Sequence, residues 1–171
     1  MNQPKNQYNM LVDFNFLPAT SRFWIFTADR LLTSDESKLI SEELASFIKQ
    51  WTAHKQELNA SFTLIDQAVL VIGVDEAQTG ASGCSIDAMT KEVVKVAQMV
   101  SVDFLNRFAI VLKTNKGLLV TNANRLKELY TSGEVTEQTL VSNTLLNNFS
   151  ELNSHLYLPI KETWMNRYLV G

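Results

Sequence analysis

TSDESKLISEELASFIKQW, the segment at residues 33–51, has the pattern of an amphipathic helix. Thr33 and Glu36 have the capping-box spacing, in which a hydroxyl and a carboxylate bind free backbone amides at a helix start. The large apolar residues behind them recur at helical spacing and form one stripe: Ile40, Leu44, Phe47, Ile48 and Trp51. We therefore expect a helix that buries this stripe.

Strand-like segments lie on both sides of this helix. Residues 22–28 are rich in aromatic and β-branched side chains, which suit a half-buried pleated surface. Residues 60–65 and 69–74 predict two strands joined by a hairpin turn at Asp66 and Gln67. The second of these strands is apolar on both faces, which is typical of a central strand.

The rest of the chain continues this alternation. A second apolar stripe predicts another helix: Ile86, Met89, Val93, Val96, Ala97, Val100 and Phe104. Residues 107–112 and 118–121 predict a hairpin, and residues 123–131 predict a short helix that ends before Gly133. Residues 138–146 are compatible with either a strand or a helix.

The predicted order of elements indicates an α+β fold. Strand, helix, strand, strand, helix and strand match the split βαβ, or ferredoxin-like, arrangement, in which helices cover one face of an antiparallel sheet. A three-layer α/β sheet is the alternative. We expect a single globular unit with an N-terminal arm at 1–20, a core at 21–122 and a C-terminal extension at 123–171 that packs on the core. The arm and the extension would cover the second face of the sheet.

Composition excludes several classes of protein. The 171 residues are 46% hydrophobic, which excludes a largely disordered chain, and a net charge of −3 gives no global attraction for nucleic acid. The longest apolar run, 68–74, is far shorter than a membrane span, and the polar start lacks a secretory pattern. We expect a cytoplasmic protein that binds neither membrane nor nucleic acid. The single cysteine, Cys84, excludes an internal disulfide.

The candidate functional site is the loop that joins the buried strand to the second predicted helix. Gly80 and Gly83 permit a close backbone approach, and serine hydroxyls together with free amides at a helix start can donate to an anion. The predicted ligand-binding residues are Asp75, Glu76, Ser82, Gly83, Cys84, Ser85 and Asp87. The leading hypothesis is a non-catalytic protein that binds a small ligand or a protein partner through the loop 80–87.

Two other interpretations of this loop stay open. Cys84 lies where a helix dipole stabilises a thiolate, so it could be the nucleophile of an enzyme. Asp75, Glu76 and Asp87 would then act as acid, base or ligands of Mg²⁺ or Mn²⁺. Alternatively, the serines only cap the helix and the glycines only turn the chain. We predict no cofactor and assign no metal site.

Several catalytic motifs are absent from the sequence. It contains no Gly-x-x-x-x-Gly-Lys-Ser/Thr, no Gly-x-Gly-x-x-Gly and no Gly-x-Ser-x-Gly, and its two histidines, His54 and His155, form no zinc-binding motif. These absences exclude a P-loop ATPase and give no support to a Rossmann dinucleotide site.

A third hypothesis is a protein-interaction module formed by the C-terminal region. The segment 107–127 carries basic residues and no acidic one: Arg107, Lys113, Lys116, Arg125 and Lys127. Such a run suits an acidic partner, although its basic residues are not interleaved with the aromatic residues that favour single-stranded nucleic acid. An exposed apolar patch beside this run would favour the hypothesis. The oligomeric state is left open.

Several strings in the chain resemble an uncharacterised family of small bacterial proteins. The resemblance extends from about Arg22 onward, and its most specific string is ASGCSID at 81–87. Other matching strings are RFWIF at 22–26, VDFLNR at 102–107, and Pro159 with Trp164 and Arg167. The resemblance implies no established activity. Members are sometimes labelled ABC-transporter ATPases, a label that the missing P-loop contradicts here.

A second resemblance is local. Residues 126–141, with Gly133 and the string TLV at 139–141, are similar to the GYF-2-type module of some bacterial proteins, which implies protein interaction. The tryptophan that usually follows this string in the module is replaced here by Ser142.

Overall fold

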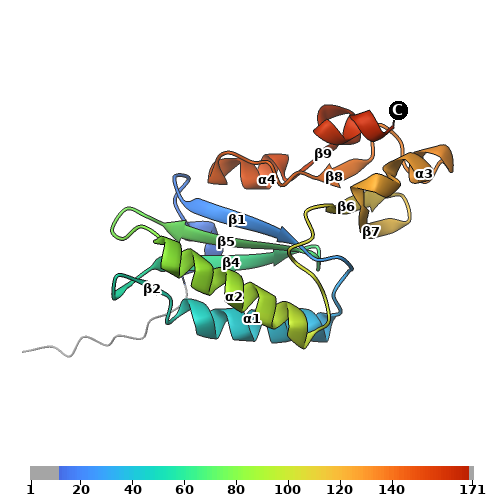
Figure 1. Cartoon of the computed structure of the whole chain (residues 1–171). Coiled ribbons are helices and arrows are strands. Elements are labelled where there is room, and N and C mark those ends of the chain that lie inside the picture. The colour runs from blue at the N-terminus through green and yellow to red at the C-terminus, as the bar shows by residue number, and fades with distance from the viewer. Residues whose placement is uncertain (1–11, 170–171) are drawn as a thin grey trace, which may run out of the picture.

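The computed structural model describes residues 12–169, which form an α+β protein built from antiparallel sheets and four α-helices (Figure 1). The first sheet has the order β1 (Arg22–Thr27), β5 (Val69–Asp75) and β4 (Asn59–Ile65). The helices α1 (Ser34–Ile48) and α2 (Gly83–Met99) lie side by side on one of its faces. The capping box of Thr33 and Glu36 is present, as predicted.

Two tight hairpins shape this half of the molecule. The strands β4 and β5 are joined at Asp66 and Gln67, where both residues have positive φ values of 52° and 53°. Positive φ values at both central residues are typical of a type I′ turn, whose twist matches that of the paired strands. The predicted hairpin is therefore confirmed. Between α1 and β4, a small hairpin joins β2 (Thr52–Ala53) to β3 (Gln56–Glu57).

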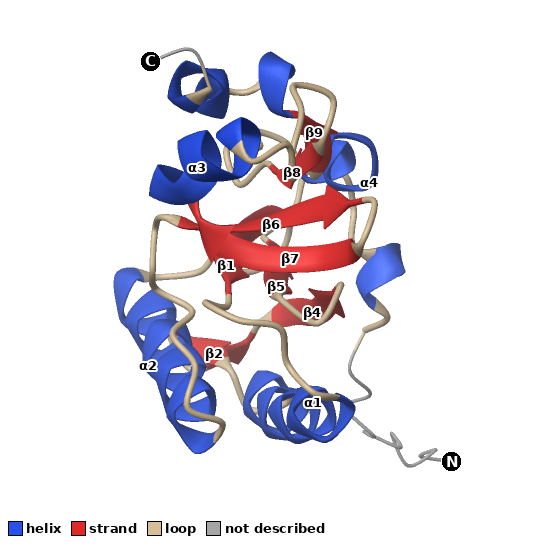
Figure 2. Cartoon of the chain, turned by 90° about the vertical axis from the view of Figure 1, so that its right-hand side faces the viewer, coloured by secondary structure: helices blue, strands red, loops and turns tan. Residues whose placement is uncertain are grey.

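A second sheet has the order β7 (Gly117–Asn122), β6 (Ala109–Thr114), β8 (Leu140–Ser142) and β9 (Tyr157–Pro159). The ambiguous segment 138–146 therefore contains a strand. The helices α3 (Leu126–Thr131) and α4 (Leu152–His155) and several short 3-10 helices complete this half. Figure 2 shows the resulting layers, with α1 and α2 below the first sheet and α3 on the far side of the second sheet.

The finer ferredoxin-like topology is not confirmed. In that topology the sixth element, β6, would extend the first sheet beside β1, whereas here β6 pairs with β7 and β8. The physical reason is that residues 117–159 supply strands of their own, which satisfy the backbone donors and acceptors of β6. All strand pairings within residues 12–169 are antiparallel and the structure is α+β, so the alternative of a three-layer α/β sheet receives no support.

The central strand β5 is buried on both faces, as its sequence predicts. Its residues Leu70, Ile72 and Val74 pack in the cluster under α1 and α2, while Val69 and Val71 pack toward the second sheet. This division follows the two-residue period of a strand.

The two sheets are joined by a shared apolar cluster and one ion pair. Val69 and Val71 of β5 pack in one cluster with Val111 of β6. At its edge, the Lys113 ammonium lies 2.9 Å from the Asp66 carboxylate and 3.8 Å from the centre of the Tyr157 ring. Burial, together with the neighbouring Asp66 carboxylate, raises the pKa of Tyr157, so its phenol stays protonated.

The described part of the predicted N-terminal arm packs against the first sheet. Leu17 is buried, and its Cδ1 lies only 2.6 Å from the position that a Cβ at Gly73 would occupy. Phe149 approaches the same position to 3.2 Å. Gly73 therefore permits close packing on the middle of β5. Residues 1–11 of the predicted arm lie outside the described residues, and among residues 12–169 no helix is long and apolar enough to cross a membrane.

Candidate functional site

The structure uses the two serines of the predicted loop as a helix cap. Ser82 is the N-cap residue of α2, and its Oγ accepts a hydrogen bond from the Ser85 amide at 3.2 Å. The buried Ser85 hydroxyl donates to the Ser82 carbonyl at 2.8 Å. Trp51 Nε1 donates to the Ser85 carbonyl, also at 2.8 Å. The serine contacts therefore cap α2, and the Trp51 hydrogen bond links its first turn to the segment that follows α1.

The carboxylates before the cap shape the loop. Glu76 Oε1 accepts from the Ala81 amide at 2.9 Å and lies 3.7 Å from the Arg22 guanidinium. Asp75 accepts from the Ala77 amide at 3.0 Å and from Asn59 Nδ2 at 3.1 Å. Within residues 12–169, no group of three or more His, Cys, Asp or Glu side chains is placed to hold a metal ion.

Three other predicted residues lie on the surface of the first turns of α2. Gly83, Cys84 and Asp87 are exposed, and a Cβ at Gly83 would meet nothing within 4 Å. The free Cys84 thiol is therefore accessible, and Gly83 marks no close backbone approach. The structure thus brings Ser82 and Ser85 together and leaves Cys84 and Asp87 at the surface. The binding role of this loop stays a prediction.

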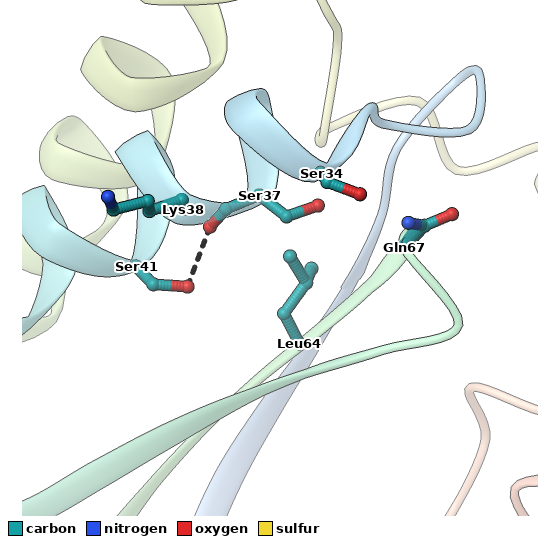
Figure 3. Close-up of a pocket in the computed structure, with 6 residues that line it drawn as sticks. All are labelled: Ser34, Ser37, Lys38, Ser41, Leu64 and Gln67. Atoms are coloured by element: carbon teal, nitrogen blue, oxygen red, sulfur yellow. Dashed lines mark hydrogen bonds between the residues drawn. The ribbon is translucent and has the colours of Figure 1, made fainter.

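A polar hollow of about 310 Å³ lies beside the N-terminal half of α1 (Figure 3). Ser37 Oγ donates to the Thr33 carbonyl at 2.8 Å, and Ser41 Oγ donates to the Ser37 carbonyl at 2.7 Å. Lys38 lies 3.9 Å from Glu42 on the same helix. The hydroxyls of Ser37 and Ser41, two of the three serines that line the hollow, are thus bonded within the helix and offer it no uncommitted donor.

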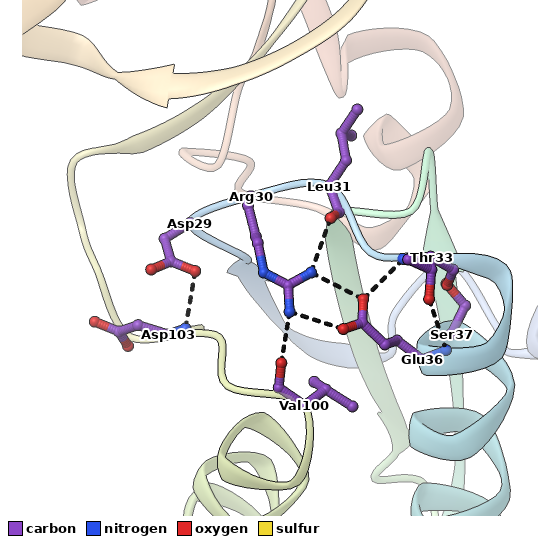
Figure 4. A network of polar contacts seen from close by, with 8 residues as sticks. All are labelled: Asp29, Arg30, Leu31, Thr33, Glu36, Ser37, Val100 and Asp103. Atoms are coloured by element: carbon purple, nitrogen blue, oxygen red, sulfur yellow. Dashed lines mark hydrogen bonds and ion pairs between the residues drawn. The ribbon is translucent and has the colours of Figure 1, made fainter.

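A network centred on Arg30 joins the segment before α1 to the end of α2 (Figure 4). The guanidinium donates to both Glu36 carboxylate oxygens at 2.8 Å and also to the Val100 carbonyl. The hydrogen bonds from Arg30 lower the pKa of Glu36 to about 2, and the Thr33 amide acts in the same direction. Both terminal nitrogens of the Arg30 guanidinium are hydrogen-bonded, so this network holds the start of α1 against the end of α2.

The largest of the hollows described here is a groove of about 480 Å³ beside the end of β1. Four separate segments line it, and we call it the inter-sheet groove. Its residues are Ile25, Phe26 and Thr27 of β1, Phe104, Leu105, Asn106, Arg107 and Ala109 around the start of β6, Thr144 and Leu145 after β8, and Trp164.

The lining of the inter-sheet groove is mainly apolar and partly exposed. Leu145 is 66% exposed, Leu105 46% and Trp164 38%. At the other extreme, Thr27 is 5% exposed, and its Oγ1 has no hydrogen-bond partner among the described residues. A buried hydroxyl without a partner costs about 1–3 kcal/mol, so the groove contains one unsatisfied polar atom within apolar walls.

The charged side chains at and beside the groove are basic. Arg107 is exposed on the lining and forms no ion pair or hydrogen bond with residues 12–169. Arg167 lies over the Trp164 ring, 5.0 Å from its centre. None of the lining residues carries a carboxylate. The groove therefore presents positive charge beside apolar surface.

Comparison with known proteins gives no further assignment: the chain matches no protein-family model, no curated protein and no solved structure.

Sequence reasoning found only part of this groove. Arg107 belongs to the basic run, and Trp164 belongs to the matching strings of the C-terminal region. Thr27 and Leu145 carry no signal in the sequence, because a threonine in a strand and a leucine in a loop are both ordinary. Only the folded chain brings them to the same hollow.

Proposed function

We propose that this chain is a non-catalytic binding protein whose ligand occupies the inter-sheet groove. The observation that carries the proposal is the convergence of Leu105, Leu145 and Trp164, all partly exposed, on one hollow that also contains the unpartnered hydroxyl of Thr27. Its volume of about 480 Å³ falls within the range of roughly 300–1,000 Å³ for ligand pockets.

The chemistry of the lining supports binding rather than catalysis. The lining residues include no histidine, cysteine, aspartate or glutamate, which are the side chains that most often serve as general bases or nucleophiles. In contrast, the hydroxyl groups of Ser82 and Ser85 in the loop 80–87 are hydrogen-bonded within the loop, and the preceding Glu76 carboxylate accepts from the Ala81 amide. The groove is therefore the better candidate for the binding site.

Titration with the neutral dye Nile red tests this proposal. We expect saturable binding of one dye per chain with a blue shift of its emission. Leu145→Glu, at a position that is 66% exposed, should abolish the shift without unfolding the protein. The matched control is Met99→Glu, on the 45% exposed Met99 of α2, which should bind dye as the wild type does. Equal dye binding by both variants would exclude the groove.

A second candidate function is protein interaction through the same surface. Phe108, 50% exposed, follows Arg107 directly, so exposed apolar surface does adjoin the basic run. This arrangement favours an acidic partner with apolar side chains. Selection of displayed peptides on the whole chain, with Leu145→Glu as the counter-selection, tests it. Enrichment only of peptides that bind both proteins equally would argue against this function.

The earlier interpretations remain proposals with their own test. A small-ligand site at 80–87 predicts a thermal shift with anions, nucleotides or divalent metals that the pair Asp75→Asn and Ser85→Ala removes. A thiol-dependent activity predicts fast alkylation of Cys84 near pH 7 in the folded protein. A cytoplasmic location and a kinship of β1–α1–β4–β5–α2 with the split βαβ arrangement belong to the same set of proposals.

A further inference from the structure

The arginines of the described residues fall into two groups, those with a carboxylate partner and those without one. Arg30 and Arg125 form hydrogen-bonded ion pairs with glutamates, and Arg22 lies 3.7 Å from Glu76. Within residues 12–169, the two arginines without a carboxylate partner are Arg107 and Arg167. Arg107 lines the inter-sheet groove, and Arg167 lies over the Trp164 ring that lines it. One arginine without a carboxylate partner thus lines the groove, and the other contacts a residue of its lining.

The carboxylates closest in sequence to the lining are already engaged. Asp29 Oδ1 accepts from the Asp103 amide at 3.0 Å, and Asp103 Oδ1 accepts from the Leu105 amide at 2.7 Å. Both therefore hold the segment that leads into the groove and form no ion pair with Arg107. A planar guanidinium without a partner matches the two oxygens of a carboxylate in a bidentate contact.

We propose that the inter-sheet groove binds an amphiphilic carboxylate, with its apolar body against Leu105, Leu145 and Trp164 and its carboxylate at Arg107. This inference rests on the proposed function and specifies the class of ligand. Thr27 offers a hydroxyl donor to any ligand oxygen that reaches the buried part of the groove. A divalent cation is disfavoured because the lining has no carboxylate, and a polyphosphate is disfavoured because apolar walls dominate.

Calorimetric titration of the full chain with octanoate and with octan-1-ol separates the two parts of this ligand. Both carry the same apolar chain, and only octanoate carries the charge. We expect octanoate to bind about tenfold more tightly, since a hydrogen bond to a charged group contributes about that factor or more. Arg107→Gln should remove this preference and leave octanol binding unchanged. Lys116→Gln, a basic residue of the same run outside the lining, is the matched control.

The outcomes are distinguishable. Equal binding of octanoate and octanol, or an unchanged preference in Arg107→Gln, would overturn the carboxylate inference and leave an apolar binding groove. Absence of binding by both compounds, or binding that Leu145→Glu does not weaken, would overturn the proposed function as well. Arg107→Lys, which keeps the charge and loses the planar fork, should retain part of the preference. Circular dichroism of each variant checks that it is folded, as the exposure of Arg107 and Leu145 leads us to expect.

Discussion

The two halves of the molecule reach a packed core by different routes. The first sheet is covered on one face by two long amphipathic helices, α1 and α2, whose buried residues fill one large cluster. The second sheet is covered by short elements, among them the six-residue helix α3 and several 3-10 helices. A long amphipathic helix shows a periodic apolar pattern in its own sequence. A short helix or strand is stabilised mainly by its contacts with the rest of the fold.

The boundary between the two halves contains both the apolar cluster that joins the sheets and the candidate binding site. The cluster of Val69, Val71 and Val111 seals the middle of the boundary. Toward the end of β1, the packing is less complete, and the inter-sheet groove opens there with Thr27 in its lining. A ligand in the groove would contact both halves.

Truncation of one buried leucine in each half should have the largest effect. Leu44 of α1 and Leu112 of β6 are both fully buried. We expect Leu44→Ala and Leu112→Ala each to lower the free energy of unfolding by about 2–5 kcal/mol, the usual cost of a cavity in a core. Because a shared cluster joins the sheets, each variant should still unfold in one transition in urea.

Far-ultraviolet circular dichroism and tryptophan fluorescence should report the same midpoint for these variants. Two separated transitions, with Leu44→Ala moving only one of them, would show that the halves are independent domains.

Gly73→Ala tests the packing of the N-terminal segment on β5. The added Cβ would lie 2.6 Å from Leu17 Cδ1 and 3.2 Å from Phe149 Cε2, so both side chains must move. We expect a loss of about 1–3 kcal/mol in the free energy of unfolding, as for other overpacked positions.

The double variant with Leu17→Ala provides the control. Since Leu17→Ala removes the closest contact, Gly73→Ala should cost less in that background than in the wild type. Strictly additive losses in urea titrations would contradict the predicted contact.

Glu36→Gln should change how the stability of the protein depends on pH. The pKa of Glu36 is lowered from 4.5 to about 2 in the folded protein, first by the hydrogen bonds from Arg30. A lowered pKa stabilises the fold above pH 4.5, and this contribution is lost as the pH falls toward 2. The wild type should therefore lose more stability than Glu36→Gln between pH 5 and about pH 2.5.

Urea titrations at several pH values measure this difference, and Glu42→Gln, whose partner Lys38 is 3.9 Å away on the surface of α1, serves as the control. Parallel pH profiles for the wild type and Glu36→Gln would refute the role of the Arg30 network.

Cys84→Ser should have the smallest effect. The thiol is exposed at the start of α2, so the substitution should change the free energy of unfolding by less than about 0.5 kcal/mol. A disulfide reagent should also label the native protein at a rate close to that of the denatured protein. Labelling only after addition of denaturant would contradict the exposure of Cys84.

The sequence predicted the helical half well because its signals are local. The capping box at Thr33 and the apolar stripes of α1 and α2 depend on residues only a few positions apart. The sequence of β5 is apolar at successive positions, which predicts a strand that is covered on both faces. The partner of β6 was not predictable in this way. Its choice between β1 and β8 depends on strands that lie far away in the chain.

The same distinction between local and long-range signals applies to the candidate sites. The serine cap of α2 could be inferred from spacing alone, since Ser82 bonds to a residue three positions away. The inter-sheet groove joins residues from β1 to Trp164, and no short string of sequence encodes such a set.

By itself, the amino-acid sequence determined the helices α1, α2 and α3, the hairpin at Asp66, the capping box of α1 and the absence of a P-loop, because these depend on the order of neighbouring residues. Tertiary structure alone decided that β6 starts a second sheet, that Gly73 receives Leu17, and that Thr27, Arg107 and Leu145 share one groove. The physical reason is that packing and pairing between distant segments are set by the balance of burial and backbone hydrogen bonding over the whole chain.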